Sequence, residues 1–170
     1  LNPIKHIDPL GSLIIPGILV FTGANLLFGW AKPVPYNPYN LRNQKWGEAI
    51  VAIAGPGINI FMAVVFGLLI RIGFGDIIGS SMFTELAMYV VHINVLLALF
   101  NMIPIPPLDG SRILKAVLPY RQQLAFTKFE ATMAQYGFIA LFLFIFLFMS
   151  LAWPVFSIVL STIVGLLTGI

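Results

Sequence analysis

The stretch that most constrains the fold is 101–110, which reads NMIPIPPLDG. It ends an apolar run, 92–100, whose composition suits a lipid environment. The three prolines cannot continue a helix, because proline lacks an amide N–H and fixes φ. The chain is therefore expected to unwind at or near membrane depth and to present Asp109 from irregular backbone. Such backbone is tolerated in a membrane only where protein buries it or where it lines a wet cavity, and an acid there is a functional-site candidate.

The composition predicts an all-α polytopic membrane protein. Of the 170 residues, 59% are hydrophobic and only 9% are charged, which is far more apolar than a soluble domain of this size requires. The net charge of +3 is not gathered into a basic cluster with interleaved aromatic residues, so we expect a lipid bilayer and no nucleic acid as a partner. Because cysteine is absent, disulfides, thiolate metal sites and a cysteine nucleophile are excluded.

The apolar segments predict a helical bundle of about four to five membrane segments in one membrane-embedded domain, 1–170. Segment 10–28 is interrupted by glycines and a proline, and it suits either a span or a re-entrant hairpin. Both alternatives stay open at this point. The other expected helices are 48–72, 83–103, one from 136 to about 152, and one from about 155 to 170, with the last two separated at Trp153-Pro154.

Two groups of side chains should lie inside the bundle. Small residues let helix backbones approach closely in lipid, and the first half of 48–72 contains Ala52, Ala54, Gly55 and Gly57. Asn59 lies one turn beyond Gly55, as an interhelical hydrogen-bonding group or as a support of the site. Asn94 and Asn101 are seven residues apart and so share one helix face, with His92 on the opposite face.

The charged loops predict the orientation in the membrane. Segment 110–135 is basic and amphipathic, as in a helix that lies on the cytoplasmic surface. Loop 32–45 is basic too, whereas loop 73–85 between them contains Asp76 and Glu85 and no lysine or arginine. By the positive-inside rule both basic loops are cytoplasmic, and Asp109 then lies toward the cytoplasmic side of the cell membrane.

Four stretches, in order, carry a family resemblance that covers about 1–118. Together they resemble the site-2 protease family of intramembrane zinc metalloproteases, in the compact bacterial branch that lacks PDZ domains. The ordered set is far more specific than any one of its members. The stretches are 1–11 (LNPIKHIDPLG), 29–35 (GWAKPVP), 55–59 (GPGIN) and 101–110 (NMIPIPPLDG).

The resemblance implies a zinc endopeptidase whose site is incomplete in these residues. The family's His-Glu-x-x-His motif does not occur in the sequence, and we expect it upstream of Leu1, which would make the chain a fragment. That motif supplies two histidine ligands and a glutamate base. Asp109 would be the third Zn²⁺ ligand, and Asn101 a donor to the oxyanion of the tetrahedral intermediate. His6 and His92 are not spaced to replace the missing pair, and a lone histidine near a membrane edge is more often interfacial.

The resemblance also implies a substrate-binding edge at 29–34. An extended edge holds a peptide by main-chain hydrogen bonds, largely independently of the peptide's sequence. A plain cytoplasmic loop is the alternative. The edge residues would be Gly29, Trp30, Ala31, Lys32 and Val34, and the bound partner a membrane-anchored protein.

Three alternatives to this interpretation stay open. Asp109 could cap the helix that follows it, a role that is compatible with metal binding. The protein could be a catalytically inactive homologue that acts as a membrane scaffold or binding protein. A small transporter or channel would use a similar unwound helix, although no paired halves with matching broken helices are found in the sequence.

Overall fold

The computed structural model describes residues 13–14, 17–18, 21–22 and 44–170. It divides into two units, Leu1–Asn40 and Leu41–Ile170, each treated by itself. In the first unit the amide of Thr22 donates to the carbonyl of Ile18, at 2.8 Å, as in one helical turn. Three predictions lie outside the described residues, namely the role of His6, the choice between span and hairpin for most of 10–28, and the edge at 29–34. The single-domain assignment stays a prediction.

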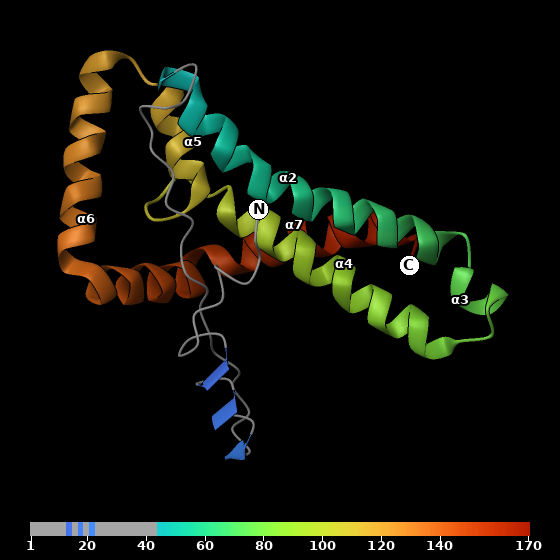
Figure 1. Ribbon diagram of the computed structural model, residues 1–170. Coiled ribbons are helices and arrows are strands. Elements are labelled where there is room, and N and C mark those ends of the chain that lie inside the picture. The colour runs from blue at the N-terminus through green and yellow to red at the C-terminus, as the bar shows by residue number, and fades with distance from the viewer. Residues whose placement is uncertain (1–12, 15–16, 19–20, 23–43) are drawn as a thin grey trace. The chain divides into compact units, whose positions relative to one another are not determined.

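The second unit begins with a pair of antiparallel helices. Helix α2 (Gln44–Arg71) and helix α4 (Ser81–Asn101) lie side by side and are joined through the short α3 (Phe74–Ile77) (Figure 1). Ser80 begins α4 as its N-cap, since its hydroxyl accepts from the amide of Phe83 at 3.2 Å. These helices confirm the membrane segments predicted at 48–72 and 83–103.

The prolines after α4 produce the predicted loop. Residues 102–108 are not helical, and α5 (Asp109–Val117) then begins. The amphipathic segment predicted as one unit, 110–135, is divided in the structure, because α5 ends before Pro119 and α6 (Tyr120–Leu147) begins after it. Leu118 has the extended conformation that proline imposes on its predecessor, with φ −66° and ψ 146°.

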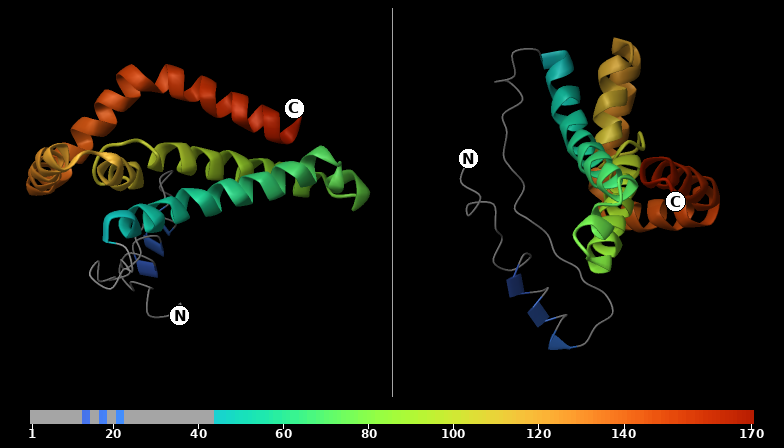
Figure 2. Two further views of the ribbon diagram at one scale, coloured as in Figure 1. Left: turned by 90° about the horizontal axis from the view of Figure 1, so that it is seen from above. Right: turned by 90° about the vertical axis from the view of Figure 1, so that its right-hand side faces the viewer.

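The chain bends twice in the C-terminal region, and one bend lies close to the helix boundary predicted at Trp153-Pro154. A single π-helical turn, η4 (Phe148–Ala152), separates α6 from α7 (Trp153–Thr168), and Figure 2 shows the chain changing direction between these two helices. Pro154 lies in the first turn of α7, where no helical hydrogen bond needs its missing N–H. The other bend, which the sequence analysis did not predict, is at Gly137, where φ 48° and ψ −118° interrupt α6. Figure 1 shows α6 changing direction along its length.

Three helices in the described part of the chain are long and apolar enough to cross a membrane, and they confirm the all-α polytopic class. The candidate spans are Trp46–Arg71, Ser81–Asn101 and Phe142–Thr168. The described residues contain no β-strand. Figure 2 shows α7 crossing beside the α2–α4 pair, with which it forms the core. That core consists of Ala63, Ile70, Ala87, Val91, Val95 and Leu160.

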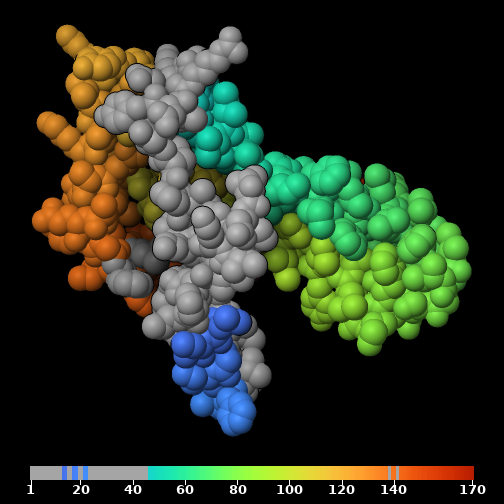
Figure 3. All heavy atoms as spheres, in the orientation of Figure 1, coloured from blue at the N-terminus to red at the C-terminus, as the bar shows by residue number. Residues whose placement is uncertain are grey.

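Close backbone approach holds α2 against α7. A Cβ added to Gly67 would lie only 2.9 Å from the Cβ of Leu167, so the two helices approach more closely there than an alanine would allow. In the space-filling view α2 and α4 form one continuous arm (Figure 3). Large apolar side chains remain exposed along both helices, as expected of surfaces that face lipid.

Candidate metal centre

Asp109 is the first residue of α5 and follows directly on the proline-containing loop. Its side chain is half-buried, and it forms neither a hydrogen bond nor an ion pair with any described residue. The N-cap position is occupied by Leu108, which makes no side-chain cap hydrogen bond. The capping alternative is therefore not seen, and the carboxylate remains available to a ligand.

The loop folds back so tightly that α5 begins against the end of α4. A Cβ on Gly110 would overlap the carbonyl oxygen of Met102 and lie 2.6 Å from that of Ile103, so only glycine fits there without a shift of the backbone. The loop also has hydrogen bonds of its own. The amide of Leu108 donates to the carbonyl of Ile105 at 2.9 Å, and the Ser111 hydroxyl donates to the carbonyl of Leu108 at 2.7 Å. These contacts fix the positions of Leu108, Gly110 and Ser111, which lie on either side of Asp109 in the chain.

Helix α2 passes the carboxylate at Gly55. An ideal Cβ on Gly55 would lie 3.3 Å from Oδ2 of Asp109. Gly55 lies nine residues after Trp46, where the candidate span begins, so at a helical rise of 1.5 Å per residue the carboxylate is level with a point about 14 Å inside that span. The acid therefore lies beside the apolar length of α2 and not beyond its end.

The small residues of α2 differ in what they face. Ala52 is buried, whereas Ala54, Gly55 and Gly57 are exposed, and no described residue lies within 4 Å of a Cβ built on Gly57. The buried positions of α2 include Ala49, Ala52, Pro56 and Ala63, a set that follows the helical period of 3.6. The small residues of this half of α2 therefore lie both on its packed face and away from it, and the packing role expected of Gly55 stays a prediction.

The asparagines lie on or near the predicted inner face. Asn94 and Asn101 are half-buried, whereas His92 is exposed. The Asn94 side-chain amide donates to the carbonyl of Val90, one turn earlier in its own helix, at 2.8 Å. Asn101 ends α4 immediately before the loop that leads to Asp109. Asn59 is half-buried too, and its role between helices stays a prediction.

The described residues supply one acid that fits a metal and no complete ligand set. No group of three His, Cys, Asp or Glu residues that could hold a metal ion occurs among them. Asp109 nevertheless fits the role of a single ligand. Its carboxylate has no hydrogen-bond partner in the described part of the chain, and its Oδ2 faces Gly55, which has no Cβ.

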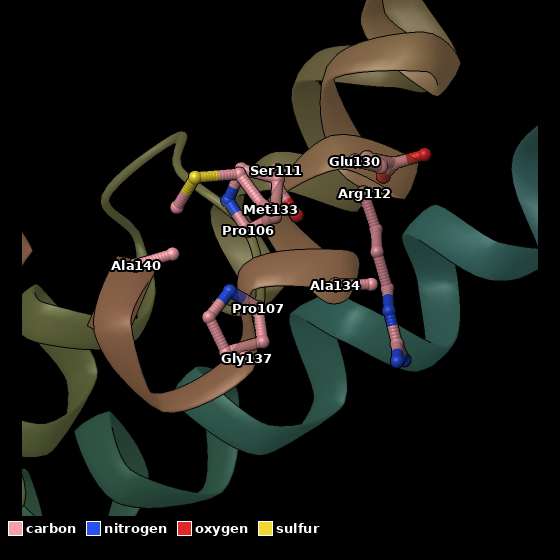
Figure 4. Close-up of a pocket in the computed structure, with 9 residues that line it drawn as sticks. All are labelled: Pro106, Pro107, Ser111, Arg112, Glu130, Met133, Ala134, Gly137 and Ala140. Carbon is pink, nitrogen blue, oxygen red and sulfur yellow. The ribbon is translucent and has the colours of Figure 1, made fainter.

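A cavity that sequence reasoning missed lies on the α6 side of the same loop. It measures about 470 Å³, and Pro106 and Pro107 line it together with one face of α6 (Figure 4). At its edge Lys115 of α5 forms an ion pair with Glu130 of α6 at 2.6 Å. The sequence signal was present, since the lining residues Glu130, Met133, Ala134 and Gly137 recur at helical spacing.

Comparison with known proteins identifies the family. The model of "Peptidase family M50" matches residues 69–144, a range that includes Asp109 and its loop. A Bacillus subtilis protein named "Putative zinc metalloprotease YwhC" is 32% identical over 180 residues, which cover all of this chain and 75% of that protein. The chain belongs to peptidase family M50. This finding confirms the resemblance to the site-2 proteases.

Two further relatives with zinc metalloprotease names cover less of the chain. "Putative zinc metalloprotease MJ0611" of Methanocaldococcus jannaschii is 42% identical over 65 residues, or 38% of this chain and 32% of that protein. "Putative zinc metalloprotease Rip2" of Mycolicibacterium smegmatis is 30% identical over 139 residues, or 82% of this chain and 50% of that protein. No solved structure matches the chain. The chain thus belongs to a zinc metalloprotease family, and its apolar helices place it in a membrane.

Proposed function

We propose that the protein is a zinc metalloendopeptidase that cleaves membrane-anchored proteins within or near the bilayer, with Asp109 as one of the metal ligands. The observation that carries the proposal is the place of this carboxylate. It lacks a protein hydrogen-bond partner among the described residues and lies beside α2 at the level of Gly55, about 14 Å inside a candidate span. An unpaired acid beside a membrane-spanning helix is costly, and such an acid is therefore a functional-site candidate.

The zinc ligands and the general base would come from Asp109 and from residues outside the described part of the chain. When bound, Zn²⁺ would lower the pKa of its water and polarise the scissile carbonyl. A catalytic zinc usually has three protein ligands, and Asp109 would contribute one carboxylate oxygen. His-Glu-x-x-His does not occur in the 170 residues, so the proposal requires that the remaining ligands and the base come from elsewhere in the protein.

Asn101 and the segment 29–34 would both act on the substrate. Asn101, at the end of α4, would donate a hydrogen bond to the oxyanion that forms at the cleaved carbonyl. The edge at 29–34 would pair with the substrate backbone once the substrate helix has unwound. A membrane-anchored protein would thus be the substrate, and the lipid bilayer the medium that delivers it.

The active site would face the cytoplasmic side. Support comes from the distribution of charge along the helices. The opposite end of the α2–α4 pair carries Asp76 and Glu85, and Arg71 near that end donates to the carbonyl of Leu166 at 3.0 Å. The helices that follow Asp109 carry Arg112, Lys115, Arg121 and Lys128.

The test is the Asp109→Asn variant of the full-length protein. The amide keeps the size of the side chain but removes the charge that binds the metal. Zinc content should fall and cleavage of a membrane-anchored substrate should be abolished, while membrane insertion persists. Asp76→Asn is the control, because Asp76 is an exposed acid at the opposite end of the helix pair. Normal zinc content and normal turnover in Asp109→Asn would disprove the ligand assignment.

A further inference from the structure

We propose that Gly55 is a positioning residue for the metal ligand, because the absence of its side chain leaves the space in which the Asp109 carboxylate lies. The inference rests on the proposed function of Asp109 and concerns a different helix. Gly55 belongs to α2 and Asp109 to α5, and the two residues meet only because these helices pack together.

The first argument concerns what the backbone asks of this position. Gly55 lies in the interior of a 28-residue helix and does not have a positive φ, so no left-handed conformation requires glycine there. It does precede Pro56, whose ring crowds the Cβ of a helical residue before it, and glycine relieves that crowding. What surrounds the missing side chain supplies a second, independent reason.

The second argument is that one atom lies in that surrounding space. Among the described residues beyond the neighbouring turns of α2, Oδ2 of Asp109 is the one heavy atom within 4 Å of an ideal Cβ on Gly55, and the separation of 3.3 Å is shorter than an ordinary van der Waals contact. An alanine methyl group would therefore push the carboxylate away by a few tenths of an ångström. Since the neighbour is the end of a side chain, the helices themselves would not have to move.

The third argument concerns the precision that a metal ligand requires. Metal–ligand distances are set to within about 0.2 Å, so a displacement that is harmless to packing is large for a ligand. Changes to residues that orient a ligand typically reduce metal affinity by about 10- to 100-fold. We expect an effect of this size when Gly55 gains a methyl group.

The same helix offers a control. Gly57 lies two residues further along α2, and no described residue lies within 4 Å of a Cβ built there. Gly55→Ala and Gly57→Ala add the same methyl group to one helix, but only the methyl group at 55 meets the Asp109 carboxylate. Because only Gly55 precedes Pro56, whose ring crowds an added Cβ, the metal measurements and not the unfolding temperature separate the two variants.

The experiment compares Gly55→Ala, Gly57→Ala and Asp109→Asn in the full-length protein in detergent. Zinc affinity is measured by competition with a chelator, and thermal unfolding is measured on the metal-free protein. Cobalt substitution adds an absorption spectrum that reports the environment of the bound metal. Gly55→Ala should bind zinc about 10-fold or more weakly and shift the cobalt spectrum, whereas Gly57→Ala should do neither. Gly57→Ala should unfold at or above the wild-type temperature, whereas Gly55→Ala should unfold somewhat lower, because its Cβ is crowded by the ring of Pro56.

The outcomes separate this inference from the proposed function. If Asp109→Asn loses zinc while Gly55→Ala binds it as Gly57→Ala does, the positioning role is overturned and the ligand assignment survives. A cobalt spectrum of Gly55→Ala that is identical to the wild-type spectrum would also overturn the inference, because the environment of the metal would then not depend on Gly55. If Asp109→Asn binds zinc normally, the ligand assignment is overturned and this inference falls with it.

Discussion

The α-carbon of Gly110 lies against the carbonyl oxygen of Met102, so closely that a Cβ would overlap it. This contact joins the start of α5 to the end of α4 across the proline-containing loop. It fixes where α5 begins, and Asp109 is the first residue of that helix. The position of the candidate ligand therefore depends on a backbone contact as well as on its own side chain.

Gly110→Ala should destabilise the bundle. The new methyl group meets backbone atoms of 102 and 103, which cannot rotate away, so the loop itself must shift. We expect a loss of about 1–3 kcal/mol, the usual cost of overpacking, measured as a lower thermal unfolding temperature in detergent. Ser111→Ala is the comparison, since it removes only the hydrogen bond to Leu108 and should cost about 1 kcal/mol. Equal unfolding temperatures for Gly110→Ala and wild type would contradict the close contact.

Gly67→Ala should weaken the packing of α2 on α7. The added Cβ would lie 2.9 Å from the Cβ of Leu167 and 3.2 Å from its carbonyl oxygen, so one helix must move outward. Unfolding in detergent should begin at a temperature several degrees lower. Gly57→Ala, on an open part of the same helix, should leave that temperature unchanged or raise it. A stabilised Gly67→Ala variant would show that the two helices are further apart than described.

Asn101→Ala should reduce turnover and leave zinc bound. Removing one oxyanion donor usually costs about 10²- to 10³-fold in kcat, and we expect a loss in that range. Asn94→Ala is the control, because the Asn94 amide is already bonded to its own helix at Val90. Kinetics and metal analysis on the same preparations are needed. Loss of zinc together with activity would mean that Asn101 supports the structure of the site.

Ala31→Pro should affect helical substrates most. A substrate helix must unwind before its carbonyl can be attacked, and each backbone group left without a partner in lipid costs several kcal/mol. An edge at 29–34 would supply partners, and proline at 31 removes one donor. Cleavage of a helical substrate should fall more than cleavage of a substrate that already carries Gly or Pro at its site. Equal losses for the two substrates would assign 29–34 to a plain loop.

The local features of the fold could be predicted because they depend on residues close together in the chain. The apolar runs at 48–72 and 83–103 became α2 and α4, since length and composition alone decide whether a helix can cross lipid. The three prolines of 101–110 ended α4 as expected, but Asp109, which was expected on irregular backbone, is the first residue of α5. The helix boundary near Trp153-Pro154 was predicted, because proline favours the first turn of a helix. The bend at Gly137 was missed, because glycine permits the positive φ found there without requiring it.

What the tertiary structure decided is which residues meet. The sequence by itself determined the membrane class, the loop and the acid, because each follows from local composition and backbone chemistry. It singled out Gly55 as a packing residue but could not show which atom lies beside it, since nothing in the local sequence relates Gly55 to Asp109. In the structure Gly55 faces the carboxylate of Asp109, whereas no described residue lies within 4 Å of a Cβ built on Gly57. That difference arises from the rotation of α2 against α5, which is set by packing between segments more than fifty residues apart.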